Sequence, residues 1–320
     1  MTMILGGRYE LVEQIGAGGM ARVWRGWSSV GGAFRRPVAI KELLPYLADD
    51  DAFAAMFAEE ARVISQLHHP NIVATYDFGT DDHGSYIIME YLPGIDMGKW
   101  ILHHARTKQR SPWGLSCAII MDVLRALGAA HEGLAGKPRV SAPDMISRAP
   151  VYHRDVTPTN VLLGEHGSVK LGDFGLARAM DRVTMTSPGV VKGKLSYVAP
   201  EILGGTRSNH ATDLYSLGII LWETLAMRRL FEGVADLELF VKVGEGNVPS
   251  LRTERPDVPP GIHDALERMV AKHPGERFPS AHAALSAFDA VMRRESEIVT
   301  PEDLAQSVAE VLDGAVVGKG

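Results

Sequence analysis

The sequence predicts an α+β fold with two lobes: a small antiparallel β-sheet with one helix, followed by a larger, mainly helical part. Residues 8–92 contain short alternating apolar runs separated by glycines, and a single helical pattern. Beyond Pro93 and Gly94, apolar residues recur mostly at helical spacing. We therefore expect a first lobe at residues 8–92, a second at residues 93–292 and a helical tail at residues 293–320.

The first lobe alternates strands with one helix. Strand patterns occupy residues 9–15, 21–27, 37–42, 72–78 and 86–90. The first two flank a glycine-rich turn, and a turn at residues 80–84 separates the last two. Residues 51–67 are predicted to be helical, because Phe53, Phe57, Ile64 and Leu67 recur at helical spacing.

The second lobe and the tail are built from helices. They are expected at residues 115–131, 213–227, 262–272 and 281–293. The second of these is apolar on every side, which predicts a buried central helix. In the tail, Thr300 and Pro301 mark a helix start. Leu304, Val308 and Val311 then form an apolar stripe that should pack on the second lobe or on a partner.

The composition is that of a globular protein with a sizeable core, with 46% hydrophobic and 22% charged residues in a chain of 320. The net charge of −6 argues against broad nucleic-acid binding. Cys117 is the only cysteine, which excludes an intramolecular disulfide and fits a reducing, cytoplasmic location. Residues 1–7 lack the pattern of a signal peptide. No run of about twenty apolar residues is apparent, so we expect no membrane span.

One short stretch carries the most chemistry. It reads His153-Arg154-Asp155, then Asn160, then Asp173-Phe174-Gly175. One of its carboxylates can accept a proton from a hydroxyl. The carboxamide and the other carboxylate can hold Mg²⁺, a hard cation that prefers oxygen ligands. This is the equipment for moving a phosphoryl group from ATP, where catalysis is mostly positioning and charge neutralisation.

A glycine-rich turn in the first lobe is compatible with the same substrate. Residues 16–19 read Gly-Ala-Gly-Gly, and their backbone N–H groups could approach phosphate oxygens, although plain turns have the same pattern. Strand period two puts Ala39 and Lys41 on one face, which offers a small residue to a flat base and a cation to a phosphate. A strand that ends in a solvated lysine is the plain alternative.

Glu60 decides between those interpretations of Lys41. At about 100° per residue it falls in the middle of the apolar stripe of the helix at residues 51–67. A carboxylate on a core-facing stripe is costly unless it is paired, and Lys41 is the natural partner. We expect this pair to hold Lys41 toward the α- and β-phosphates of ATP. The alternative is a Glu60 that reaches solvent at a helix end.

With these motifs in order, and with Ala199-Pro200-Glu201 after them, the chain resembles the protein kinase superfamily. It is most similar to the eukaryotic-like Ser/Thr protein kinases of bacteria. The resemblance covers residues 8–292. It implies the bilobal protein kinase fold, ATP-dependent phosphoryl transfer to Ser or Thr of a protein substrate, Mg²⁺ as cofactor, and leaves a kinase-domain dimer open.

The resemblance also implies roles for single residues. Asp155 would orient the substrate hydroxyl and accept its proton, while Asn160 and Asp173 would bind Mg²⁺. Met89 would guard the back of the adenine pocket, and residues 90–92 would form the hinge that bonds the adenine. Val23, Ala39 and Leu162 would sandwich the base. The full nucleotide site would comprise Ile15, Gly16, Gly18, Val23, Ala39, Lys41, Met89, Glu90, Leu92 and Leu162.

Other roles implied by the resemblance are structural. The spine that aligns the two lobes would stack Ile64, His153 and Phe174. Asp213, at the start of the buried helix, would brace the backbone of the catalytic loop. Glu201 would pair with Arg277.

Two positions depart from the family pattern. Ser/Thr kinases usually have a lysine two residues after the catalytic aspartate, where this chain has Thr157. They usually have a threonine where this chain has Lys194, shortly before Ala199. We hypothesise that the two residues exchange roles, so that Lys194 supplies the cation near the transferring phosphoryl group and Thr157 supplies the hydroxyl. The alternative is a solvated Lys194 in an enzyme that tolerates the loss.

Regulation and competing functions complete the predictions. Arg154 would bind a phosphate on Thr184 or Thr186, which predicts autophosphorylation there. The stretch at residues 133–150 is interpreted as a tolerated surface insertion rather than a docking site.

The sequence around Pro158 disfavours a tyrosine kinase. A pseudokinase scaffold and a small-molecule phosphotransferase remain the alternatives to a Ser/Thr protein kinase.

Overall fold

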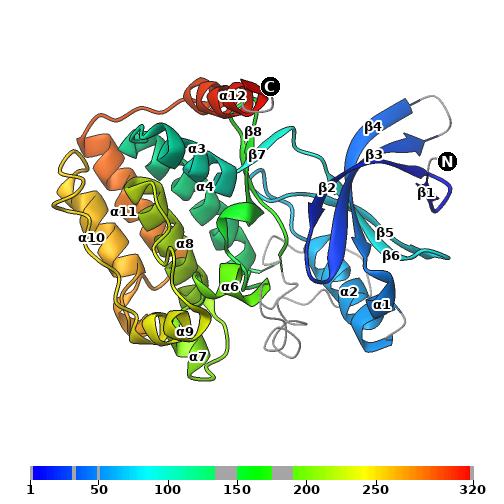
Figure 1. Ribbon diagram of the computed structural model, residues 1–320, viewed down its shortest axis with the longest axis horizontal. Coiled ribbons are helices and arrows are strands. Elements are labelled where there is room, and N and C mark those ends of the chain that lie inside the picture. Colours follow the sequence, from blue (N-terminus) through cyan, green and yellow to red (C-terminus); the bar gives the residue numbers. More distant parts are fainter. Residues whose placement is uncertain (1–2, 31–33, 49–50, 134–149, 175–189, 318–320) are drawn as a thin grey trace, which may run out of the picture.

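The computed structural model describes residues 3–30, 34–48, 51–133, 150–174 and 190–317. Figure 1 shows a sheet-rich lobe and a larger helical lobe joined by the extended chain that leads into β7. The predicted α+β class with two lobes is confirmed.

The first lobe is an antiparallel sheet in the order β1-β2-β3-β4-β6-β5. Its strands are β1 (Ile4–Leu5), β2 (Tyr9–Ala17), β3 (Ala21–Val30), β4 (Phe34–Leu43), β5 (Thr75–Asp81) and β6 (Gly84–Glu90). The helices α1 (Pro45–Ala48) and α2 (Asp51–Ile64) belong to the same lobe. Leu43, Phe57, Ala61 and Ile87 form the apolar core between these helices and the sheet.

The second lobe is mostly helical. It contains α3 (Met97–Thr107), α4 (Trp113–His131), α6 (Val190–Leu195), α7 (Pro200–Leu203), α8 (His210–Ala226), α9 (Asp236–Glu245), α10 (Pro260–Met269), α11 (Ala281–Arg294) and α12 (Pro301–Val317). A small sheet of β7 (Gly94–Asp96), β8 (Val161–Gly164) and β9 (Val169–Leu171) lies beside the first lobe. As predicted, α8 is the central helix, with apolar side chains buried on all sides.

Helix α4 bears on the expectation that the chain has no membrane span. By length and composition, Trp113–His131 is apolar enough to cross a membrane, although it carries Asp122 and Arg125. In the fold, 72% of its most apolar window is buried inside the protein, against α8 and α11. Buried core helices of globular proteins in general pass the same test of composition, so the finding is weak evidence for a span.

Several elements differ from the sequence expectation. Helix α2 ends at Ile64, three positions before the expected end, and β5 begins at Thr75 rather than at residue 72. Ile72 instead bridges to Leu171 of the second lobe. The helix α3 and the strands β7 to β9 had no counterpart in the prediction. The three strands are only three or four residues long, too short for a clear sequence pattern, and they form by pairing with one another.

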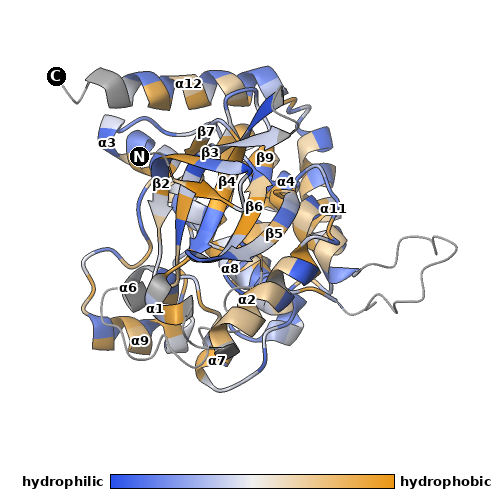
Figure 2. Ribbon diagram, turned by 90° about the vertical axis from the view of Figure 1, so that its right-hand side faces the viewer, coloured by the Kyte–Doolittle hydropathy of each residue, from blue (hydrophilic) through white to orange (hydrophobic). Residues whose placement is uncertain are grey.

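The tail packs on the second lobe. Helix α12 lies along α3 and the edge of the small sheet, with its apolar and polar residues on different faces (Figure 2). Leu304, Val308 and Val311 are buried there, as the apolar stripe predicted. The indole N–H of Trp100, a fully buried side chain, donates to Ser307 Oγ at 2.8 Å. Of the two expected surfaces, the helix therefore covers its own lobe.

Candidate active site

The catalytic loop between α4 and β8 is held by Asp213 at the start of α8. Asp213 Oδ2 accepts the His153 N–H and Oδ1 accepts the Arg154 N–H, each at 2.8 Å. Arg154 has a φ of 66°, an uncommon backbone for this residue type, which these bonds help to hold. Burial acts to raise the pKa of Asp213, but its bonds to His131 and to the loop hold the pKa below its ordinary value. The predicted brace is confirmed.

His153 links this loop to the Asp-Phe-Gly segment. Its Nε2 lies 2.8 Å from the Gly172 carbonyl, and its Nδ1 accepts the Asp155 N–H at 3.3 Å. Burial lowers the pKa of the ring, so a neutral imidazole that donates from Nε2 satisfies both contacts. The backbone before Asp155 is therefore connected directly to the residue before Asp173.

Asp155 has two nitrogen neighbours. Lys194 Nζ lies 2.6 Å from Asp155 Oδ2, and Asn160 Nδ2 lies 3.2 Å from the same oxygen. Asn160 Nδ2 also donates to the Asp155 carbonyl at 2.8 Å. Lys194 comes from α6, so its cation reaches the carboxylate from outside the catalytic loop. The geometry matches the position that the hypothesis of exchanged roles gives to the cation.

Thr157 occupies the position where relatives of this type usually have the lysine. Its side chain is buried, and its Oγ1 lies 3.0 Å from Thr159 Oγ1. It directly precedes the turn Pro158–Asn160, whose last residue contacts Asp155. The hydroxyl is thus bonded within the catalytic loop, to Thr159, so the half of the hypothesis that assigns the hydroxyl role to Thr157 stays a prediction.

Lys41 and Asp173 join the two lobes. Lys41 Nζ donates to Asp173 Oδ1 at 2.7 Å, across 132 positions of sequence. The Lys41 side chain is 6% exposed and that of Asp173 is 35% exposed, so the carboxylate faces the opening. Burial acts to raise the pKa of Asp173, but the charge and the hydrogen bond of Lys41 and, less strongly, the charge of Lys194 hold it below its ordinary value. Asp173 has a φ of 56°, a strained backbone of the kind found at functional sites.

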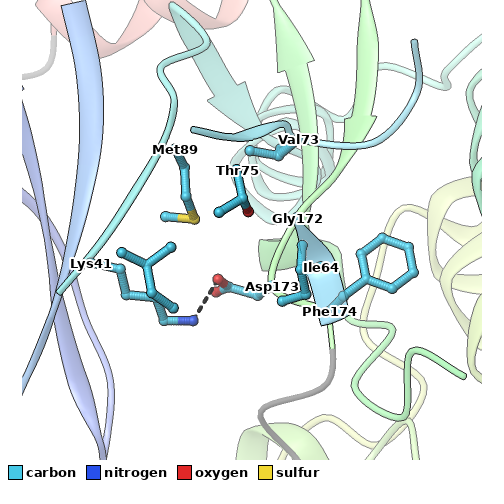
Figure 3. Close-up of a pocket in the computed structure, with 9 residues that line it drawn as sticks. Lys41, Ile64, Val73, Thr75, Met89, Gly172, Asp173 and Phe174 are labelled. Atoms are coloured by element: carbon cyan, nitrogen blue, oxygen red, sulfur yellow. Dashed lines mark hydrogen bonds and ion pairs between the residues drawn. The ribbon is translucent and has the colours of Figure 1, made fainter. Parts of the chain in front are cut away.

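A small pocket lies behind this ion pair (Figure 3). Its lining comes from both lobes and comprises Lys41, Ile64, Val73, Thr75, Ile87, Met89, Gly172, Asp173 and Phe174. The rings of Phe174 and His153 are 4.5 Å apart, and Ile64 lies next to Phe174 in the view. The contact of Phe174 with His153 is therefore as predicted, and Ile64 lines the same pocket as Phe174.

The predicted nucleotide residues gather on the inner face of the sheet and its edge. Val23 of β3 is the partner of Lys41 of β4, and Met89 of β6 is the partner of Ala39. Gly16 pairs with Val23, while Ile15 is exposed. From the second lobe, Leu162 on β8 lies near Gly172. Leu92, in the connection between the lobes, is half-buried and lies near Gly164. Gly18 closes the turn by donating its N–H to the Ala21 carbonyl at 2.9 Å.

Glu90 anchors the start of the connection between the lobes. Its N–H donates to the Ala74 carbonyl at 2.8 Å, and its Oε2 lies 3.1 Å from Lys170 Nζ. The Glu90 side chain therefore stabilises the fold. In the hinge at residues 90–92, the backbone rather than the Glu90 side chain would bond the adenine.

Behind the segment that carries Lys194 lies a polar network that sequence reasoning missed. Tyr197 donates its hydroxyl to Glu223 Oε2 at 2.7 Å, and Arg229 Nη1 lies 2.9 Å from the same oxygen. The Leu230 N–H donates to Glu223 Oε1 at 3.0 Å. Burial raises the pKa of Glu223, although these partners oppose the shift. A glutamate within an otherwise apolar helix was the signal that could have revealed the network.

Further along, the predicted Glu201–Arg277 pair is confirmed. Arg277 Nη1 and Nη2 donate to the two Glu201 oxygens at 2.7 and 2.8 Å. The Arg277 guanidinium also bonds the Ala211 carbonyl at the start of α8. The pair therefore ties α7 to the helix that carries Asp213.

Some predicted residues lie outside the part of the chain that the structure describes. Glu60 is in α2, but its side chain is not among the described ones, so its pairing with Lys41 stays a prediction. Thr184 and Thr186 fall within the undescribed residues 175–189. Most of the insertion, residues 134–149, is likewise outside.

Comparison with known proteins supplies the context for this geometry. The family described as "Protein kinase domain" matches residues 9–288. The chain is 35% identical over 285 residues to the tyrosine-protein kinase MasK of Myxococcus xanthus, covering 88% of this chain and 43% of MasK. It is 31% identical over 303 residues to the serine/threonine-protein kinase PrkC of Bacillus subtilis, covering 93% of this chain and 43% of PrkC.

A shorter relative is covered more completely. The chain is 30% identical over 301 residues to the serine/threonine-protein kinase PknL of Mycobacterium tuberculosis, covering 94% of this chain and 69% of PknL. Among solved structures, the PknI kinase domain of Mycobacterium tuberculosis superposes with a TM-score of 0.63 at 27% identity, over 91% of this chain and 99% of that one. Rad53 (residues 1–466, with AMP-PNP) has the same fold, with a TM-score of 0.67 at 22% identity over 88% of this chain and 65% of that one. The chain spans about two fifths of the length of MasK and PrkC.

Proposed function

The chain belongs to the protein kinase family, and we propose that it transfers the γ-phosphoryl group of ATP to a Ser or Thr hydroxyl of a protein substrate. PrkC and PknL, both serine/threonine-protein kinases, support this choice of acceptor. The observation that carries the proposal is the single carboxylate oxygen of Asp155, which is contacted at 2.6 Å by Lys194 Nζ and at 3.2 Å by Asn160 Nδ2.

In the proposed reaction Asp155 accepts the proton of the acceptor hydroxyl. The hydroxyl oxygen forms a bond to the γ-phosphorus, the bond from that phosphorus to the bridging β–γ oxygen breaks, and ADP leaves. Lys194 holds a positive charge beside the reacting atoms, where it would offset the negative charge of the transferring group. Because Lys194 also bonds Asp155, it would fix the direction in which the carboxylate meets the hydroxyl.

Asn160 and Asp173 fit a magnesium ion. Asn160 uses its amide nitrogen for both bonds to Asp155, which leaves the carbonyl oxygen as its ligand atom. Asp173 uses Oδ1 toward Lys41, and its partly exposed carboxylate has a second oxygen. Mg²⁺ is commonly held by one or two protein groups together with substrate phosphates, which matches this donor set. The ion would neutralise phosphate charge, while Asn160 also keeps Asp155 in place.

Lys41 would bind the α- and β-phosphates. Its stem is buried between the sheet and the pocket of Figure 3, so the ammonium has a fixed position next to Asp173. Phosphate oxygens would share the ammonium with that carboxylate. Ala39, on the same strand face, leaves room for the base between the lobes.

A second acceptor, tyrosine, has one observation in its favour. MasK, at 35% identity, is a tyrosine-protein kinase. Against it, the sequence around Pro158 disfavours tyrosine, and PrkC and PknL are serine/threonine-protein kinases. A pseudokinase scaffold would bind nucleotide without turnover, and a small-molecule phosphotransferase would not label protein.

Autophosphorylation on Thr184 or Thr186 is part of the proposal. Arg154 is exposed and directly precedes Asp155. A phosphate on Thr184 or Thr186 would pair with the guanidinium of Arg154 beside the site. A mass spectrum of active protein with neither threonine modified would contradict this part alone.

One experiment tests the acceptor. The protein is incubated with Mg-ATP and generic protein substrates, and the phosphorylated amino acid is identified, with Asp155→Asn as the control. We expect phosphoserine or phosphothreonine. Phosphotyrosine alone would show that the acceptor is tyrosine, as the name of MasK states for that protein. Thermal stabilisation by nucleotide without any turnover would indicate a pseudokinase.

A further inference from the structure

The glycine-rich turn is bonded to a segment outside its own hairpin. Tyr46 of α1 donates its hydroxyl to the Gly19 carbonyl at 2.8 Å. Two residues earlier, the Leu44 N–H donates to the Met20 carbonyl at 2.9 Å. Two successive carbonyls at the tip of the turn are thus held by residues 44–46, a contact that the sequence analysis did not anticipate.

We propose that Tyr46 is a positioning residue that holds the glycine-rich turn in its phosphate-binding conformation. The proposal rests on the proposed function, because it assigns the turn to ATP phosphates. Tyr46 would touch neither nucleotide nor substrate. It acts through Gly19, whose carbonyl accepts its hydroxyl.

The reason is the geometry of the peptide group. A peptide unit is planar and trans, so its carbonyl and the following N–H point in opposite directions. Fixing the Gly19 carbonyl on Tyr46 therefore fixes the Met20 N–H on the other side, and fixing the Met20 carbonyl on Leu44 does the same for the Ala21 N–H. The Gly19–Met20 peptide has a glycine on one side, and the backbone freedom of Gly19 otherwise lets this peptide rotate at lower cost. Without the hydroxyl, the Gly19–Met20 peptide can turn its carbonyl toward the phosphates, which repel it.

The other end of the contact is anchored in the core. Leu47, next to Tyr46, is buried with Leu43, Phe57 and Ala61, and Met20 packs on the same cluster. The Leu47 N–H donates to the Leu44 carbonyl at 2.9 Å, which shapes the turn that presents Tyr46. Because Phe57 and Ala61 belong to α2, a shift of α2 moves the anchor of the turn. The position of the helix that carries Glu60 and the conformation of the turn are therefore coupled.

The test is Tyr46→Phe, which deletes one hydroxyl. Tyr46 is 65% exposed, so the bond competes with water and its loss should be modest. We expect the Kd of a non-hydrolysable ATP analogue with Mg²⁺ to rise by about two- to five-fold, the lower part of what one neutral hydrogen bond contributes. At saturating nucleotide, kcat and the KM for protein substrate should stay unchanged, which separates positioning of the turn from general damage.

Tyr76→Phe is the matched control. Tyr76 is also an exposed tyrosine of the first lobe, and its ring packs under Arg36, a contact that phenylalanine keeps. It should leave the nucleotide Kd unchanged. Equal Kd values for wild type, Tyr46→Phe and Tyr76→Phe would overturn the proposal.

A second measurement does not depend on the function. Hydrogen exchange of the amides in residues 16–23 should be faster in Tyr46→Phe than in Tyr76→Phe without any nucleotide. If the wild type and Lys41→Ala bind nucleotide equally poorly, the proposed function fails, and faster exchange in Tyr46→Phe would still support the contact. Unchanged exchange in Tyr46→Phe would refute the contact even in an active kinase.

Discussion

Lys194 Nζ lies 2.6 Å from Oδ2 of Asp155, although the two residues are 39 positions apart and come from different segments of the second lobe. The position that usually carries a lysine in this family holds Thr157, which is bonded to Thr159 instead. The structure places the ammonium of Lys194, from α6, beside Asp155. This arrangement ties the proposed chemistry to the segment between Asp-Phe-Gly and Ala-Pro-Glu, and it leads to the first prediction.

Lys194→Ala should lower kcat for phosphoryl transfer by about 10²- to 10³-fold, because removing one preorganised charge from a transition state costs about that much. The nucleotide Kd should change little, since Lys41 still binds the phosphates. Steady-state kinetics and nucleotide titration measure the two effects. Lys242→Ala, which removes a surface lysine of α9, is the matched control. Unchanged turnover in Lys194→Ala, with turnover abolished in Lys41→Ala, would refute the exchange of roles.

The double variant Thr157→Lys with Lys194→Thr sharpens this prediction. It restores the arrangement usual in the family, so it should recover part of the activity that Lys194→Ala loses. A double variant as inactive as Lys194→Ala would mean that the position of the cation, and not only its charge, is fixed in this chain.

Asp213 should make stability depend on pH in the acid range. Its pKa in the folded chain lies below the value of about 3.9 of an unfolded aspartate. The contribution is therefore present above the unfolded pKa and is lost as pH falls through the folded pKa. Asp213→Asn should be less stable at neutral pH, and the difference from wild type should narrow below about pH 4. Thermal unfolding from pH 7 to pH 3 measures this, with the partly exposed Asp289→Asn as control. A constant difference across that range would contradict it.

Glu201→Ala should destabilise the second lobe by about 3–5 kcal/mol, because it leaves the buried Arg277 charge without its partner. The Arg277 side chain is 0% exposed. Urea unfolding measures the loss. Glu238→Ala breaks an exposed pair with Lys242 one helical turn away, and should cost about 0.3–0.5 kcal/mol. Equal effects of the two variants would show that burial of the Arg277 pair has no energetic consequence.

Ser307→Ala should weaken the docking of α12. It leaves the indole N–H of Trp100 buried without an acceptor, which costs about 1–3 kcal/mol. Urea unfolding followed by tryptophan fluorescence detects this, and Gln306→Ala, on the exposed face of the same helix, should have no effect. If both variants unfold like the wild type, α12 does not depend on this hydrogen bond.

The sequence predicts the fold class because hydrophobic periodicity is strong where elements are long. The stripe of α2 and the uniformly apolar α8 are examples, and the motif order fixes which lobe each belongs to. It fails where pairing is long-range. Residues 72–74 are predicted to belong to a strand because they are apolar. In the structure Ile72 instead forms an isolated β-bridge with Leu171 of the other lobe. The helix α3 has polar residues on one face and Trp100 on the other. Its apolar face is explained by the tertiary structure, in which Trp100 contacts Ser307 of α12.

The site divides in the same way. Local motifs identify Asp155, Asn160 and Asp173, because residue type and spacing carry the chemistry. Distances between segments are a property of the fold, so the sequence offers Lys194 as a hypothesis and only the structure gives its 2.6 Å contact with Asp155. No sequence pattern predicts the hydrogen bond between Tyr46 and Gly19, because it joins a tyrosine side chain to a backbone carbonyl 27 positions away.

The most direct test of the account is the rate of γ-phosphoryl transfer by wild type and Asp155→Asn, measured alongside nucleotide binding by both. Wild type should label protein in the presence of Mg-ATP. Asp155→Asn should bind the nucleotide as well as wild type and lose transfer almost completely, because the amide cannot accept the hydroxyl proton. Comparable transfer by both proteins, or no transfer by wild type that binds Mg-ATP, would contradict the assignment of Asp155 as the catalytic base.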